Sequence, residues 1–197
     1  MDHYFTNNPK LSGDEREFVV RVRGLEIRLT TEAGVFSKRG LDFGSRLLIE
    51  SVQLPDSAYA VDLGCGYGPI SAVLGQAYPD SRWILLDVNA RAVQLAQRNT
   101  ASLGGRRQLL VSDGFQACPE VSVDAIVFNP PIRAGKAVVY RLFQEAREHL
   151  KPGGSLWIVM QKKQGAPSAR KELERLFSSV EDVARSGGYH IFRSTVK

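Results

Sequence analysis

The chain of 197 residues has few cysteines and histidines, and these shortages exclude several classes of site. Its two cysteines, Cys65 and Cys118, lie far apart and form no Cys-x-x-Cys pair. They indicate free thiols in a reducing compartment and not a disulfide or metal framework. The three histidines (His3, His149 and His190) are scattered, and no Ser-His-Asp set is visible. We therefore expect no metal site and no catalytic histidine.

Long apolar runs and a secretory leader are also missing. The first residues, MDHYFTNNPK, show no basic start followed by an apolar stretch. No apolar run approaches the roughly 18 residues that suggest a membrane span. Together with the free thiols, this predicts a cytoplasmic protein that does not bind a membrane.

The composition is that of one globular domain. Hydrophobic residues make up 43% of the chain, and its net charge is +5 with a pI near 9.4. This positive charge suits a polyanion such as RNA, although small-molecule enzymes can be equally basic. We expect a single domain over residues 1–197, with an N-terminal hairpin and helix extension over 1–57 and a core over 58–197.

The hydrophobic pattern predicts an α/β fold. Alternation from Phe18 to Arg28 around Gly24 indicates a β-hairpin, and a helix is expected from Asp42. Beyond residue 58, short apolar strands alternate with helical segments, which is typical of parallel βαβ units. Strands are expected at 59–63, 83–87, 108–111, 123–128, 155–160, 180–184 and 189–194, and helices at 68–78, 90–103, 137–150 and 169–177. The last two strands leave no room for a helix between them, so the last should run antiparallel. The predicted fold is a Rossmann-like, seven-stranded, mostly parallel sheet with helices on both faces and the hairpin as an extension.

The tetrapeptide Asn129-Pro130-Pro131-Ile132 follows the apolar run at 125–128, which indicates a buried strand. The strand must stop there, because the two prolines remove two backbone donors and fix φ near −65°. A polar amide then lies at the end of a sheet, beside carbonyl groups without ladder partners. Such a site can hold a planar NH2 group, although a proline-stopped loop remains the alternative.

A glycine-rich segment lies at the first strand-to-helix junction of the core. Gly64, Gly66 and Gly68 allow a tight turn and close approach to a ligand. The spacing is GxGxG after an acid, Asp62, and not the GxGxxG of dinucleotide sites. An acid there would repel a pyrophosphate and suits a cation such as an amino group. A purely structural turn is the alternative.

Two further acids follow successive strands. Asp87 ends the strand at 83–87, where a carboxylate can accept both hydroxyls of a ribose; alternatively it caps the next helix. Asp113 follows the third strand and could accept from the amine of an adenine, with Phe115 nearby, or simply form an Asp-Gly turn. Ligands of open α/β sheets bind at this carboxyl edge.

These residues together resemble the class I S-adenosylmethionine-dependent methyltransferases. The matching segments are VDLGCGYG at 61–68, WILLDVN at 83–89, SDGF at 112–115 and NPPI at 129–132. The segment GVFSKRGLDFGS at 34–45 more narrowly resembles the bacterial small-subunit ribosomal RNA guanine-N2 methyltransferases, in a single-copy form. The resemblance covers about residues 34–160.

The resemblance implies an enzyme with S-adenosylmethionine as its cofactor. The implied catalytic residues are Asn129, Pro130, Pro131 and Ile132. The implied cofactor-binding residues are Val35, Phe36, Ser37, Lys38, Asp62, Gly64, Cys65, Gly66, Gly68, Asp87, Val88, Asp113, Gly114, Phe115 and Asn129. Many members of the family have an aromatic residue after the two prolines to stack on the base, whereas this chain has Ile132; Arg133 could stack instead, or face solvent or a phosphate.

The implied reaction is methylation of the exocyclic N2 amine of a guanine in ribosomal RNA, with RNA or the small ribosomal subunit as partner. Two alternatives stay open: methylation of another NH2 group, on a protein glutamine or a small molecule, and a non-catalytic cofactor- or RNA-binding accessory protein. Basic residues near the proposed site could track phosphates. They are Arg16, Arg21, Arg23, Lys38, Arg39, Arg133, Lys136, Lys162 and Lys163.

Overall fold

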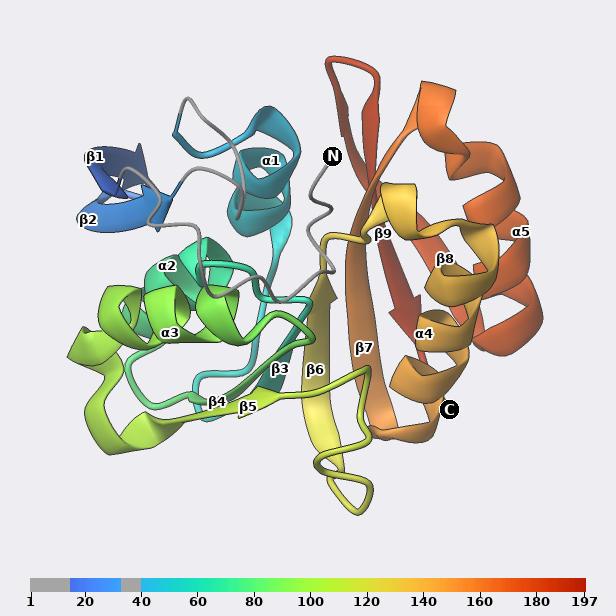
Figure 1. Ribbon diagram of the computed structural model, residues 1–197. Coiled ribbons are helices and arrows are strands. Elements are labelled where there is room, and N and C mark those ends of the chain that lie inside the picture. The colour runs from blue at the N-terminus through green and yellow to red at the C-terminus, as the bar shows by residue number, and fades with distance from the viewer. Residues whose placement is uncertain (1–14, 33–39) are drawn as a thin grey trace.

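The computed structural model describes residues 15–32 and 40–197, and its core is a seven-stranded sheet (Figure 1). The strands are β3 (Tyr59–Leu63), β4 (Arg82–Asp87), β5 (Arg107–Val111), β6 (Val123–Phe128), β7 (Leu150–Gln161), β8 (Ser179–Ser186) and β9 (Tyr189–Thr195). Their order across the sheet is β5-β4-β3-β6-β7-β9-β8. The first five in this order run parallel, and β9 is antiparallel to both β7 and β8. The predicted sheet is confirmed.

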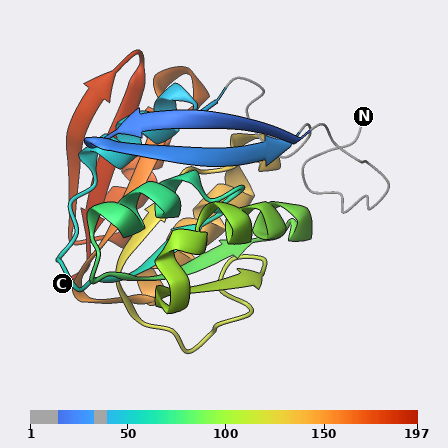
Figure 2. The ribbon, with the colours of Figure 1, turned by 90° about the vertical axis from the view of Figure 1, so that its left-hand side faces the viewer.

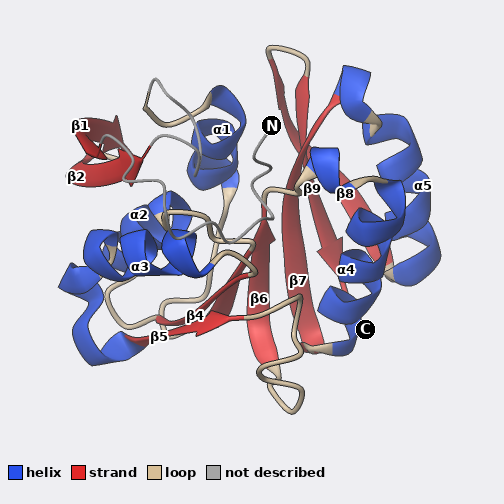
Figure 3. Ribbon diagram, in the orientation of Figure 1, coloured by secondary structure: helices blue, strands red, loops and turns tan. Residues whose placement is uncertain are grey.

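Helices cover both faces of this sheet, three on one side and two on the other (Figure 3). They are α1 (Phe43–Ser51), α2 (Pro69–Ala77) and α3 (Ala90–Asn99) on one face, and α4 (Lys136–Glu148) and α5 (Ala166–Leu176) on the other. Strand β6 shows why its sequence is apolar throughout: Val127 packs into the cluster under α1–α3, and its neighbours Ile126 and Phe128 pack into the cluster under α4 and α5. Burial on both faces explains the continuous apolar run.

The predicted hairpin is formed by β1 (Glu15–Val22) and β2 (Leu25–Glu32), which make a separate two-stranded sheet. Its turn residues, Arg23 and Gly24, both have positive φ (53° and 73°), as a two-residue hairpin turn requires. The hairpin lies across α2 and α3 (Figure 2). Its inward residues, such as Leu29, join the core cluster of those helices.

One side chain, Asn99 at the end of α3, joins the hairpin to the core. Its Nδ2 donates to the carbonyls of Thr30 and Tyr67, both at 2.7 Å. Its Oδ1 accepts from the Thr30 amide at 2.7 Å. Since Thr30 lies in β2 and Tyr67 in the glycine-rich segment, Asn99 couples the hairpin to the turn after β3.

Two expected boundaries were wrong. The helix expected over 90–103 ends at Asn99, and a 3-10 segment, η1 (Ala101–Arg106), follows it; within η1, Gly104 has the non-helical values φ 55° and ψ −132°. The strand expected from residue 155 begins instead at Leu150, as β7. Its pairing with β6 continues on both sides of an irregularity, and the expected turn at 151–154 lies within that irregularity. Two single-turn segments, η2 (Ile132–Ala134) and η3 (Lys162–Gln164), follow β6 and β7.

Within residues 15–32 and 40–197, no helix has both the length and the apolar character needed to cross a membrane.

Candidate functional site

The carboxyl ends of four neighbouring parallel strands bring the predicted site residues to one edge of the sheet. The turns after the strands are connected to each other. The Cys65 amide donates to the Leu86 carbonyl at 2.9 Å, and the Ser112 amide donates to the Asp87 carbonyl at 2.9 Å. The segments after β3, β4 and β5 therefore form one continuous rim, and β6 lies beside β3.

The glycine-rich segment makes a turn that only glycine adopts without strain. The φ angles of Gly64, Gly66 and Gly68 are 66°, 55° and 80°. A Cβ on Gly68 would also lie 3.0 Å from the Ala96 Cβ, so this glycine lets α2 and α3 approach closely. The segment thus forms a tight turn that a ligand can approach, and it also brings α2 and α3 into contact.

Asp62 lies in β3 on the face under α2 and is fully buried. Its Oδ2 accepts from the Ser71 amide at 3.1 Å and also from the Ser71 hydroxyl. Its Oδ1 is buried and has no hydrogen-bond partner in the described structure. Burial raises the pKa of this carboxyl to about 7; the Ser71 bonds oppose the shift and the charge of Asp87 adds to it. An amino group at this edge would supply the missing partner, so the site fits a ligand that carries one.

Two more polar atoms near the glycine-rich turn have no hydrogen-bond partner among the described residues. They are the Tyr67 hydroxyl and Oδ2 of Asp42. Burial raises the pKa of Tyr67, and the charge of Asp42 adds to the shift. Oδ1 of Asp42 caps α1 by accepting from the Ser45 amide at 2.9 Å. Sequence reasoning did not select Asp42 or Tyr67, although both lie within segments that it singled out.

Asp87 is 3% exposed and supports the glycine-rich turn. Its Oδ2 accepts from the Gly66 amide at 2.9 Å, and its Oδ1 accepts from the Asn89 amide at 2.8 Å. The N-cap of α3 is Asn89 and not Asp87, because the Asn89 Oδ1 accepts from the first amides of the helix. Val88, between the two, is half-buried at the same edge. The expected position of Asp87 at the end of β4 is confirmed; its contact with a ribose stays a prediction.

The loop after β5 is attached to α4. Asp113 Oδ1 pairs with the Arg141 guanidinium at 2.6 Å. Gly114 has φ 58°, and a Cβ on it would lie 2.0 Å from Glu145 Oε2. Arg141 and Glu145 therefore fix the loop that carries the predicted adenine-binding residues. Arg141 was not anticipated, because it lies 28 residues beyond Asp113.

Cys65 and Phe115 belong to segments at the carboxyl edge of the sheet, but the side chains of both are buried. Burial raises the pKa of the Cys65 thiol, and the charges of Asp62 and Asp87 add to the shift. The Phe115 ring is 2% exposed and stacks on His149 with ring centroids 4.1 Å apart. A ligand at the edge would therefore meet backbone atoms of these two residues.

Asn129 follows β6 and is oriented by α1. Its Nδ2 donates to the Ser45 Oγ at 2.9 Å. With Nδ2 engaged, Oδ1 is the atom left to accept a donor from a ligand. The Pro131 carbonyl accepts from the Ala134 amide at 2.8 Å, whereas no described backbone amide donates to the Pro130 carbonyl. The site therefore presents two acceptors on a proline-stiffened backbone.

Ser45 is the residue that sequence reasoning missed here. It is 3% exposed and lies on α1, far from Asn129 in sequence. The available signal was its position at the end of the segment at 34–45. Ile132, after the prolines, is half-buried and packs against the core cluster under α4, while Arg133 is exposed.

Val35, Phe36, Ser37 and Lys38 lie outside the described residues, and their predicted role stays a prediction.

Two members of the predicted basic face have partners within the chain. Arg21 forms an ion pair with Glu26 at 2.7 Å. Arg23 is exposed, but its Nη1 donates to the carbonyls of Ile49 at 3.0 Å and Val52 at 2.8 Å, at the end of α1. Lys38 and Arg39 lie outside the described residues. The other described members are surface residues at the hairpin, after β6 and after β7: Arg16, Arg133, Lys136, Lys162 and Lys163. Their contact with phosphates stays a prediction.

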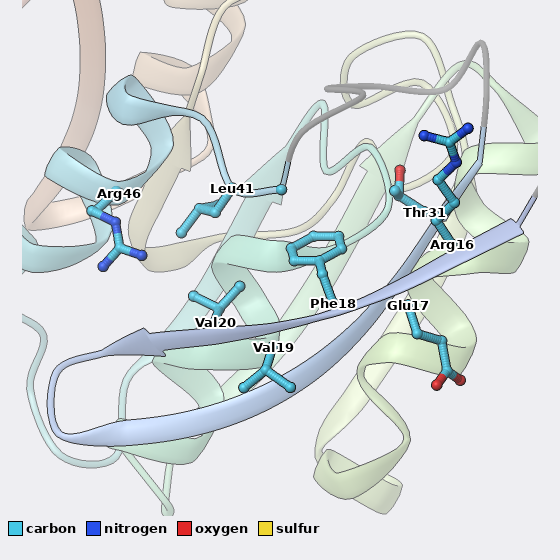
Figure 4. Close-up of a pocket in the computed structure, with 9 residues that line it drawn as sticks. Arg16, Glu17, Phe18, Val19, Val20, Thr31, Leu41 and Arg46 are labelled. Carbon is cyan, nitrogen blue, oxygen red and sulfur yellow. The ribbon is translucent and has the colours of Figure 1, made fainter.

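A hollow of about 340 Å³ lies between the hairpin and the start of α1 (Figure 4). Phe18 and Leu41 point into it, whereas Glu17 and Val19 point away. The Phe18 ring lies edge-on to that of Tyr67, 6.2 Å between centroids. The hollow thus adjoins the glycine-rich turn but contains none of the acids of the edge. Among the residues that the structure describes, no cluster of three or more acids, histidines or cysteines could hold a metal.

Comparison with known proteins shows which proteins this chain resembles. A family model described as the methyltransferase small domain matches residues 26–193. The chain is 42% identical to the uncharacterized protein YbxB of Bacillus subtilis, over 98% of both chains. It is 32% identical to ribosomal RNA small subunit methyltransferase C of Stutzerimonas stutzeri, over 94% of this chain and 56% of that protein.

A solved structure shows the same architecture. It is the 16S rRNA N2 G1207 methyltransferase RsmC of T. thermophilus, in complex with AdoMet and guanosine. The two structures align with a TM-score of 0.82 at 26% sequence identity, over 96% of this chain and 52% of that one. The chain thus spans about half the length of these ribosomal RNA methyltransferases.

Proposed function

The chain belongs to the methyltransferase small domain family, and we propose from this premise that it transfers a methyl group from S-adenosylmethionine to the exocyclic N2 amine of a guanine in ribosomal RNA. The likeness to proteins whose names specify ribosomal RNA supports an RNA substrate. The net charge of +5 agrees with it. We also propose that residues 1–197 act as one domain, in the cytoplasm.

The arrangement around Asn129 is the observation that carries the proposal. A guanine amine is a weak nucleophile because its lone pair is delocalised into the ring. Asn129 Oδ1 and the Pro130 carbonyl accept no hydrogen bond from residues 15–32 or 40–197, and each can take one N–H of the amine. That contact favours a pyramidal nitrogen and directs its lone pair out of the base plane. Catalysis is then mainly positioning and stabilisation of developing positive charge.

The same edge has the groups that would hold the cofactor. Asp62 Oδ1 would accept from the amino group of its methionyl part, because this buried oxygen has no partner in the described structure. Asp87 would accept from the ribose and Asp113 from the adenine. The bound cofactor supplies a methyl group on a positively charged sulfonium. The chain's own groups would orient the target amine, whose N–C bond forms as the C–S bond of the sulfonium breaks to leave a thioether; the surplus amine proton then passes to solvent.

A methyl-transfer assay tests the proposal. Tritiated S-adenosylmethionine is incubated with unmethylated ribosomal subunits and with naked ribosomal RNA, and the product is digested to nucleosides. We expect label in N2-methylguanosine with the wild type and a loss of about 100-fold or more with Asn129→Ala. Label in a protein glutamine, or equal transfer by the variant, would overturn the assignment.

A further inference from the structure

An aromatic pair lies at the start of α1, the helix that holds the proposed catalytic residue. Phe43, the first residue of α1, is 47% exposed. Its ring packs on Tyr189, the first residue of β9, with centroids 5.6 Å apart and planes tilted by 44°. A large apolar ring held in place yet half open to solvent is available to a partner.

Two glycines leave room for this pair. A Cβ on Gly44 would lie 3.0 Å from the Tyr189 ring, and a Cβ on Gly187 would lie 3.0 Å from the Phe43 ring. Gly187 has φ 55° in the turn between β8 and β9. The backbone of the helix start therefore approaches the Tyr189 ring closely, and the backbone of the hairpin turn approaches the Phe43 ring.

The pair is continuous with the site. Gly44, which contacts Tyr189, precedes Ser45, the hydrogen-bond partner of Asn129. Ile132, which occupies the place of the aromatic residue in related enzymes, packs toward α4. Helix α1 thus supplies both an exposed ring, Phe43, and the residue that holds Asn129.

Positive charge lies beside the rings. Lys162 and Lys163 are exposed, and the Lys162 amide donates to the Gly188 carbonyl at 2.8 Å, in the same hairpin turn. Neither lysine forms an ion pair with any residue of 15–32 or 40–197. Binding sites for single-stranded nucleic acids combine aromatic faces, on which bases stack, with positive charges that contact the phosphates.

We propose that Phe43, backed by Tyr189, stacks on an unpaired base of the RNA segment that enters the site, while Lys162 and Lys163 contact its phosphates. This inference rests on the proposed function. Phe43 would stack on the base in this chain, in which Ile132 and not an aromatic residue follows the two prolines. The stack is sequence-tolerant, since every base has a π face.

Binding of a fluorescently labelled single-stranded RNA oligonucleotide, followed by anisotropy, tests the stack. Phe43→Ala and Phe43→Leu should weaken the affinity about 5- to 100-fold, the range of one lost base stack, whereas Phe43→Tyr should keep it. Leucine retains the apolar volume, so it separates stacking from packing. Val19→Ala is the matched control, because Val19 is also 47% exposed and points outward from β1. Chemical denaturation of each variant checks the fold.

The outcomes separate this inference from the proposed function. Unchanged binding by a folded Phe43→Leu protein would overturn the stack, even if the wild type methylates guanine. Weakened binding by that variant supports the stack, even if the wild type methylates no RNA, in which case only the proposed function fails. A wild type that binds no single-stranded RNA would overturn the stack directly.

Discussion

The Asn129 carboxamide donates from Nδ2 to the hydroxyl of Ser45 at 2.9 Å, so helix α1 sets the rotation of the proposed catalytic amide. Ser45→Ala should therefore lower kcat about 5- to 10-fold, the equivalent of one ordinary hydrogen bond, with little change in cofactor affinity. Single-turnover methyl transfer and calorimetry with S-adenosylmethionine measure the two effects. Ser45→Thr keeps the hydroxyl and should recover most of the rate.

A double-mutant cycle tells positioning from a general effect on the fold. In an Asn129→Ala background, Ser45→Ala should cost almost nothing, because the group that it orients is gone. Equal losses in both backgrounds would show that Ser45 does not act through Asn129.

Gly68→Ala should destabilise the protein beyond the ordinary cost of positive φ. Alanine in the left-handed region costs about 1–2 kcal/mol, and here its Cβ would also lie 3.0 Å from the Ala96 Cβ. Gly24→Ala is the matched control, since Gly24 has φ 73° and no atom would lie within 4 Å of the added Cβ. Urea denaturation should give a larger loss for Gly68→Ala. Similar losses in the two variants would mean that the helix contact yields easily.

Asp62→Asn should change the pH dependence of stability in a defined direction. The pKa of Asp62 is raised from 3.8 to about 7, chiefly by burial. Between these values the unfolded state releases the proton first, so the wild type loses stability as the pH rises. Relative to Asp62→Asn, this loss should reach about 4 kcal/mol above pH 7.

Denaturant unfolding of both proteins from pH 4.5 to 8 measures the difference, in which the other titrating groups cancel. A difference that does not vary with pH would contradict the raised pKa of Asp62.

Arg23→Ala should act on stability and leave RNA binding largely intact. Its guanidinium donates to two carbonyls at the end of α1 and to the Tyr78 hydroxyl at 3.0 Å. A single hydrogen bond to a charged group contributes about 1.5–3 kcal/mol, and we expect a total loss in this range because Arg23 is exposed. Lys163→Ala should do the reverse, with unchanged stability and a salt dependence of RNA binding reduced by about one phosphate contact. A weaker salt dependence for Arg23→Ala would return that residue to the RNA-binding face.

The sheet could be predicted from the sequence because its strands are buried on both faces. The run at 125–128 contains no polar residue, so neither face of the strand can be exposed to solvent. Its residues pack alternately into the two core clusters. The acids at the strand ends followed from the same pattern, because parallel strands place their carboxyl ends together. The assignment of residues 1–197 to one domain remains a prediction.

Contacts between distant side chains could not be predicted in this way. Arg23 is an exposed residue, as the alternation of its hairpin neighbours indicates, but its hydrogen-bond partners lie 26 and 29 residues further along the chain. The pairing of Asp113 with Arg141 and that of Asn129 with Ser45 likewise depend on which helix lies over which strand end. The hydrophobic periodicity of a segment does not indicate which distant side chain will pair with it.

The three hydrogen bonds of Asn99 make the surface hairpin and the glycine-rich turn a single cooperative unit. We therefore expect the backbone amides of β2 to exchange together with those of the turn after β3, and not as an independent surface element. A substitution on the outer surface of the hairpin should in consequence change the affinity for a ligand bound at the glycine-rich turn.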